Sequence, residues 1–97
     1  MEILELKFGD KVYTNPKKIN DILLQNKFYW LIDSEMSDAV LEIQKQTLIW
    51  HSGIFMSGIW KYGIFKNGGF YGVFENGIFE DGHFDGIWKS GINLKNN

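Results

Sequence analysis

The chain has 97 residues and a formal net charge of −2 at pH 7, and all ten of its basic residues are lysines. This length fits one small domain. The absence of cysteine excludes disulfides, thiolate zinc sites and cysteine nucleophiles, and the absence of arginine disfavours binding to double-stranded nucleic acid.

The hydropathy pattern shows no membrane-spanning segment. No apolar run approaches the about 18 residues that a membrane helix needs. Acidic residues interrupt the apolar N-terminus, which is atypical of a signal peptide. We therefore expect a cytoplasmic protein without a transmembrane segment.

Residues 1–47 are expected to form an N-terminal α+β segment. Leu4, Leu6 and Phe8 alternate with charged side chains, which predicts a half-buried strand. A glycine-containing turn then leads into a second predicted strand at 11–14.

A short helix is predicted next, at about 16–25. Asn15 is a favourable N-cap, and Pro16 suits the first helical position. Residues 27–33 are aromatic and β-branched, which predicts a strand. Residues 37–46 alternate apolar and polar side chains, so we favour a strand over a helix there, with one more strand directly after it.

Residues 48–97 form a second region, rich in glycine and aromatic residues. Ten of the 11 glycines lie between Gly53 and Gly91, and the pattern repeats every 14 residues. A repeat this regular indicates stacked supersecondary units, each of which buries a face against the next. The equivalent positions include Gly58, Gly72 and Gly86; Trp60, Phe74 and Trp88; Gly63, Gly77 and Gly91; and Ile64, Ile78 and Ile92.

Each unit is expected to be a β-hairpin within an antiparallel β-meander. Asn67-Gly68, Asn76-Gly77 and Asp81-Gly82 are typical of type I′ hairpin turns, and short β-prone runs lie between them. The alternative is a β-solenoid of the pentapeptide type, with glycine and phenylalanine pointing inward. The predicted fold class is therefore α+β, mostly β, with both regions in one continuous folding unit.

The repeat resembles a known family. "FYGVFENG" at 70–77 and "FDGIWKSG" at 84–91 resemble the Tyr-x-Gly-x-Phe-x-x-Gly core of MORN repeats, hairpin repeats that stack into elongated sheets. The resemblance covers residues 50–94, although MORN units are longer than these. Short glycine-aromatic repeats of uncharacterised phage proteins are similar too. Because MORN-like proteins are mostly scaffolds and adaptors, the resemblance implies binding rather than chemistry.

Residue types that often carry catalysis are present without a catalytic pattern. His51 and His83 lack metal-ligand spacing, so we expect surface or turn histidines. No serine lies in a nucleophile elbow, and no phosphate-binding loop is present. We expect no enzyme, no cofactor and no metal. The acidic residues form two groups, in which any two carboxylates could form a glycosidase-like pair, but we expect the second group to be a solvated strand edge. The groups are Glu35, Asp38 and Glu42, and Glu75, Glu80, Asp81 and Asp85.

The aromatic residues of the repeat are the candidate partner-binding residues. A single-layered sheet cannot bury both faces by itself. Uncovered rings of about 150–250 Å² each would exceed the apolar patch that monomers usually expose. These rings therefore form a core, a self-association surface or a partner surface. The candidates are Trp60, Phe65, Phe70, Phe74, Phe79, Phe84 and Trp88.

From these observations the sequence predicts a non-enzymatic protein-binding module with a rigid aromatic surface. A specific form of this hypothesis is a small phage-type inhibitor of a host defence enzyme, that is, an anti-defence factor. One alternative is single-stranded nucleic-acid binding by aromatic stacking, with Lys61, Lys66 and Lys89 near the backbone. Another is a membrane-binding or structural scaffold.

Overall fold

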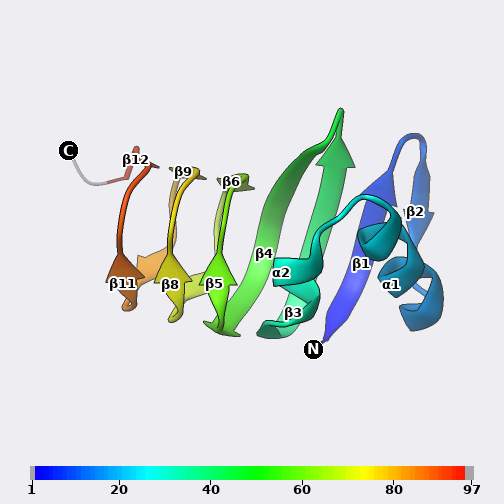
Figure 1. Cartoon of the computed structure of the whole chain (residues 1–97), viewed down its shortest axis with the longest axis horizontal. Coiled ribbons are helices and arrows are strands. Elements are labelled where there is room, and N and C mark those ends of the chain that lie inside the picture. The colour runs from blue at the N-terminus through cyan, green and yellow to red at the C-terminus, as the bar shows by residue number, and fades with distance from the viewer. Residues whose placement is uncertain (1, 96–97) are drawn as a thin grey trace.

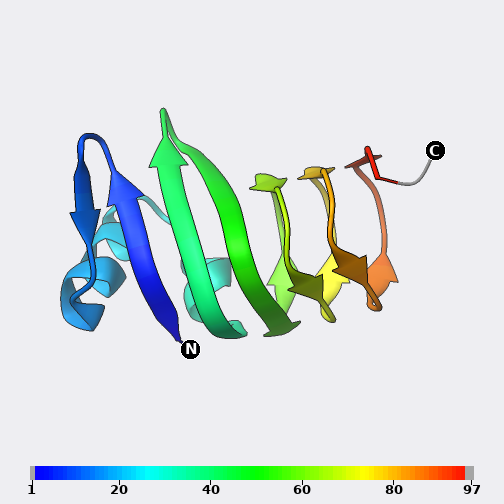
Figure 2. The same cartoon turned by 180° about the vertical axis from the view of Figure 1, so that it is seen from behind.

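The structure, a computed structural model, describes residues 2–95 and is mostly β with two helices (Figures 1 and 2). Its strands stack along a long axis of 36 Å, and the two other axes measure 22 and 20 Å. The predicted class, α+β and mostly β, is confirmed.

The N-terminal region is a sheet of four strands in the order β2-β1-β3-β4. The pair β1–β3 is parallel, whereas β1–β2 and β3–β4 are antiparallel. All four strands were predicted, β1 and β3 from apolar–polar alternation. They are β1 (Ile3–Phe8), β2 (Lys11–Tyr13), β3 (Glu35–Gln44) and β4 (Thr47–Ser57).

Two helices lie on one face of this sheet (Figure 1). Helix α1 (Pro16–Gln25) matches its prediction, and the Asn15 Oδ1 accepts a hydrogen bond from the Lys18 N–H at 3.1 Å. The strand predicted at 27–33 is wrong, because helix α2 (Tyr29–Ile32) forms there.

The reason for α2 is the spacing of its buried side chains. Phe28 and Leu31 are buried, whereas Tyr29 between them is 53 % exposed. This is the three-residue spacing of one helical face, so packing against α1 and the sheet overrides the strand propensity of the aromatic side chains.

From β4 onward the chain winds as a β-solenoid of about three turns; paired positions are 15 residues apart between β4 and its neighbours β6 and β7, and 14 residues apart in the later turns. Each turn, or coil, has three short sides. The first side stacks β4, β6 (Ile64–Phe65), β9 (Ile78–Phe79) and β12 (Ile92–Asn93); the second stacks β4, β7 (Gly69–Phe70) and β10 (His83–Phe84); the third stacks β5 (Ile59–Trp60), β8 (Val73–Phe74) and β11 (Ile87–Trp88).

The antiparallel hairpin meander predicted for this region is therefore wrong, and the solenoid alternative is correct. All pairs among β4 to β12 are parallel, and each residue lies beside its equivalent one coil away, as Ile64 lies beside Ile78. Gly68, Gly77 and Gly82 have φ of 126°, 122° and 122°, but the residues before them do not have positive φ. Type I′ turns need positive φ at both positions, so these dipeptides form corners instead.

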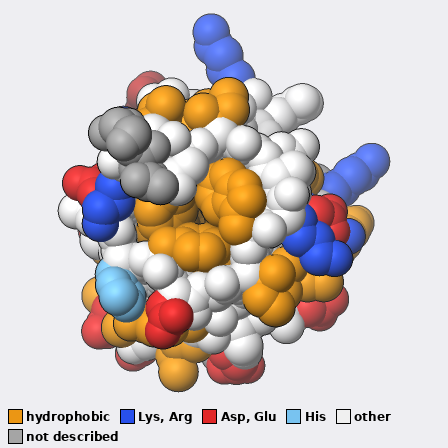
Figure 3. All heavy atoms as spheres, turned by 90° about the vertical axis from the view of Figure 1, so that its left-hand side faces the viewer, with side chains coloured by type: hydrophobic (Ala, Val, Ile, Leu, Met, Phe, Trp, Pro, Cys, Tyr) orange, Lys and Arg blue, Asp and Glu red, His pale blue; other side chains and the backbone are white. Residues whose placement is uncertain are grey.

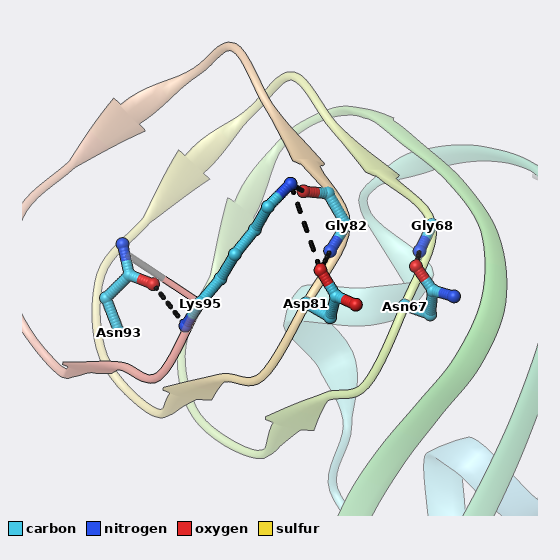
Figure 4. Close-up of polar contacts among 6 residues, drawn as sticks. All are labelled: Asn67, Gly68, Asp81, Gly82, Asn93 and Lys95. Carbon is cyan, nitrogen blue, oxygen red and sulfur yellow. Dashed lines mark hydrogen bonds and ion pairs between the residues drawn. The ribbon is translucent and has the colours of Figure 1, made fainter. Parts of the chain in front are cut away.

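At the corners, the side chains of asparagine and aspartate accept hydrogen bonds from the N–H of the glycine that follows them (Figure 4). The Asn67 Oδ1 accepts from the Gly68 N–H at 2.9 Å, and the Asp81 Oδ1 accepts from the Gly82 N–H at 2.8 Å. Coils pack closely here: a Cβ on Gly77 would lie 2.5 Å from the carbonyl oxygen of Gly63. Glycine is thus required both for its positive φ and for its lack of a side chain.

The solenoid core consists of three columns of stacked rings, one behind each side. Ring centroids within a column lie 4.6–6.1 Å apart at small interplanar angles, and rings of different columns meet edge to face. The same core continues without a break into Leu6, Leu23 and Leu41 of the N-terminal region. The columns are Trp50–Phe65–Phe79, Phe55–Phe70–Phe84 and Trp60–Phe74–Trp88.

Candidate protein-contact surfaces

Five of the seven aromatic residues proposed from sequence as partner contacts are inside the core. Trp60, Phe65, Phe70 and Phe74 have 0 % exposure, and Phe79 has 1 %. A tube closed on three sides turns the rings of its three columns inward, which removes the aromatic face that a flat sheet would have; Tyr62 and Tyr71, outside the columns, are exposed. Within the columns, only Phe84 and Trp88, at the C-terminal end of the stack, are partly exposed.

One row of exposed apolar residues lies on the outer side of β5, β8 and β11. Ile59 pairs with Val73, and Val73 pairs with Ile87, so the three side chains form a row, here called the aliphatic ladder. Ile59 is 43 % exposed and Ile87 is 59 % exposed. The three strands lie side by side in Figure 1. The outward aliphatic position of the 14-residue repeat is the sequence signal for this row.

A hollow adjoins the first residue of the ladder. It is lined by residues of α2, of the loop after α2, and of β5 and its two flanking positions. The indole N–H of Trp30 is buried without a hydrogen-bond partner. The indole N–H groups of Trp50 and Trp60, in the core, are also buried without a partner, so what distinguishes Trp30 is that it lines the hollow. The lining residues are Trp30, Asp33, Ser34, Gly58, Ile59 and Lys61.

Charged side chains on the outside of the solenoid alternate in sign from coil to coil. Lys61, Glu75 and Lys89 occupy equivalent positions, and the Lys61 Nζ lies 3.9 Å from the Glu75 Oε2. At another corner the Lys95 Nζ lies 3.8 Å from the Asp81 Oδ1 and donates to the Gly82 carbonyl (Figure 4). Each exposed pair contributes little to stability, but the alternation avoids stacking like charges.

The last coil that the structure describes is open on its outer edge. Strands β10, β11 and β12 each pair on one side only within residues 2–95. Figure 3 looks onto this end and shows hydrophobic side chains at its centre and on its rim. Ile87, Ile92 and Leu94 are each more than half exposed. Residues 83–94 are called the open coil below.

His51 and His83 are partly or fully exposed, whereas Glu42, beside His51, is buried. The His51 Nε2 lies 2.8 Å from the Glu42 Oε1, across strands β4 and β3, and the Gln44 Nε2 donates to the Glu42 Oε2 at 2.9 Å. The bond to His51 holds the pKa of Glu42 below its ordinary value, although burial acts in the opposite direction; Gln44 and the charge of Lys7 support the lowering.

The other titratable groups form no comparable network. The His83 ring packs near Tyr71, with centroids 5.8 Å apart. Within the described part of the chain, no group of three or more histidine, cysteine, aspartate and glutamate residues is placed to hold a metal ion.

Comparison of the chain with protein-family models, with curated proteins and with solved structures finds no match. Among the residues that the structure describes, no helix is long and apolar enough to cross a membrane.

Proposed function

We propose that the protein is a non-enzymatic protein-binding module that contacts its partner through the aliphatic ladder and the hollow beside Trp30. The observation that carries this proposal is the row Ile59, Val73 and Ile87, an apolar surface next to an indole N–H without a hydrogen-bond partner. Binding energy at protein interfaces concentrates in apolar and aromatic residues at such pockets.

The rigidity of the solenoid favours this role. The backbone behind the ladder is fixed by parallel pairing and by the ring columns, in which Trp60, Phe74 and Trp88 stack directly under the ladder strands. A surface that is already ordered loses little conformational entropy on binding, so more of the contact energy remains for affinity.

A narrower form of the proposal is inhibition of a host defence enzyme by a small phage-type protein. It is supported by the small size of the chain, the rigid exposed ladder and the resemblance of its repeat to short glycine-aromatic repeats of phage proteins. A MORN-like relationship is part of the same proposal and rests on the motif at 70–77 and 84–91 alone. The parallel solenoid differs from the hairpins of MORN repeats.

Single-stranded nucleic acid is not proposed as the partner. Base stacking needs exposed rings, and five of the seven rings considered for it are buried. The alternation of Lys61, Glu75 and Lys89 also leaves no continuous basic track along this side of the solenoid.

The test is capture of protein from a nuclease-treated host lysate by the tagged chain and by two variants. Ile59→Lys places a charge in the ladder and is expected to lower capture at least about ten-fold. Val12→Lys makes the same change at another exposed aliphatic residue, on β2, and should capture like the wild type. Equal capture by the wild type and Ile59→Lys, or no captured protein at all, contradicts the proposal.

A further inference from the structure

Among the strands of residues 2–95, β11 of the open coil pairs with β8 alone, in parallel, so its other edge faces away from the stack. One coil earlier, the carbonyls of Phe70, Gly72 and Phe74 accept hydrogen bonds of 2.9 Å from the N–H groups of Asp85, Ile87 and Lys89. Peptide groups alternate in direction along a strand. The N–H and C=O groups of Gly86 and Trp88 therefore face outward, away from the stack. Such an edge is a template for another chain.

Within residues 2–95, the two ends of the solenoid differ. At the other end, β4 pairs with β3, and the sheet continues through β1 and β2 under the two helices (Figure 2). Head-to-tail stacking of copies is therefore blocked. On the third side β5 is the edge strand, but α2 lies beyond it, with Trp30 packed against Trp60 at a centroid distance of 5.1 Å. A second copy therefore has its most accessible strand edge in the open coil, and two open coils placed against each other form a two-fold arrangement.

A two-fold arrangement pairs the two β11 strands antiparallel, and the outward residues suit that pairing. Asp85, Ile87 and Lys89 are all exposed and carry a negative, an apolar and a positive side chain in that order. Antiparallel pairing centred on Ile87 places Asp85 opposite Lys89 of the second copy, twice. It also places Gly86 of one copy opposite Trp88 of the other. The outward N–H and C=O groups of these two residues can then form hydrogen bonds between the copies.

We propose that two copies of this chain associate end to end through their open coils. The exposed rim residues Ile87, Ile92 and Leu94 and the partly exposed rings of Phe84 and Trp88 become covered in the pair. Charge alternation is also maintained across the junction, since Lys89 meets an aspartate as Lys61 meets Glu75. This inference goes beyond the proposed function and does not depend on it.

The size of the end sets the strength of the association. The molecule measures 22 by 20 Å across its long axis. End-to-end contact therefore covers on the order of 400 Å² on each copy, below the roughly 800 Å² per partner of a standard stable interface. The dimer is accordingly of the weak, concentration-dependent class.

The experiment is sedimentation velocity of the 97-residue chain over a range of concentrations, with charge-swap variants. The wild type is expected to shift from monomer to dimer as concentration rises. Asp85→Lys and Lys89→Asp each bring like charges together twice, so each should weaken association about ten-fold or more. The double variant restores opposite charges and should associate within about two-fold of the wild type.

Controls separate this outcome from misfolding and from net-charge effects. Asp10→Lys makes the same charge change in the β1–β2 turn, far along the chain from the open coil, and should leave association unchanged. Thermal melting checks that all variants fold, as expected for exposed positions. A wild-type chain that stays monomeric to about 1 mM overturns the proposal. So does a charge-swap variant that associates normally, or a double variant that does not recover.

Discussion

The two regions of this molecule build β-structure by different rules. In the N-terminal sheet, each strand of three to eleven residues pairs with a partner of different sequence, and helices cover one face. In the solenoid, each two-residue strand lies against its own equivalent, as Val73 lies against Ile87, and no helix is needed. The first design depends on which face of a strand is apolar, and the second depends on identical positions stacking in register.

The largest expected effect separates the interior of a ring column from its open end. Trp60 has no exposed surface and packs against Trp50, Phe55 and Phe74. Trp60→Ala should lower the free energy of unfolding by about 3–5 kcal/mol. Trp88→Ala, in the same column but partly exposed, should cost clearly less, as measured by urea denaturation of both variants. Equal losses would show that the open coil is as tightly covered as the interior.

A smaller effect distinguishes a solenoid corner from a sheet turn. Gly77 has a φ of 122°, and a Cβ there would lie 2.5 Å from the Gly63 carbonyl oxygen. Gly77→Ala should therefore cost roughly 2–3 kcal/mol. Gly9, in the β1–β2 turn, has a φ of 65° and open space at its Cβ position. Gly9→Ala should cost about 1 kcal/mol, since only the left-handed backbone is unfavourable. A reversed order in urea denaturation would contradict the close packing of the coils.

The smallest effect is a pH dependence that belongs to the N-terminal sheet. The pKa of Glu42 is lower in the folded protein than its ordinary value, chiefly because of the hydrogen bond from His51. Its stabilising contribution is therefore present above the ordinary glutamate pKa and is lost as pH falls through the folded pKa. Glu42→Gln should flatten the decline of melting temperature below about pH 5.

The sequence predicted the N-terminal elements well where one periodicity dominated. The alternation in β1 and the Asn15-Pro16 pair before α1 each have one structural interpretation. The failure at α2 came from residues 28–32, where strand propensity and the helical spacing of Phe28 and Leu31 compete within a very short segment. Trp30 of α2 also packs against Trp60, with ring centroids 5.1 Å apart. This contact favours the helix, and it cannot be seen locally because the two residues are far apart in the sequence.

In the repeat, the sequence revealed the period but not the direction of pairing. Asn76-Gly77 favours a hairpin locally, and the same dipeptide serves as a corner when the chain turns by less than a full reversal. The stronger signal was the aromatic residue at every equivalent position. In-register stacking of like rings, as in Phe55, Phe70 and Phe84, requires parallel neighbours. Once pairing is parallel, the predicted contact rings become the core, and the outward residues become the candidate site.

Beyond the first step from β4, the rings of each column are 14 residues apart, so the solenoid can change its length in register only by whole coils. Removal of residues 70–83 as a block would place Trp60 beside Trp88 and Ile59 beside Ile87. The solenoid would then be shorter by one coil, which is about 4.8 Å along its axis. Removal of one residue fewer would offset all three columns at once. The length of the solenoid can therefore change by whole coils while the residue types on its three sides stay the same.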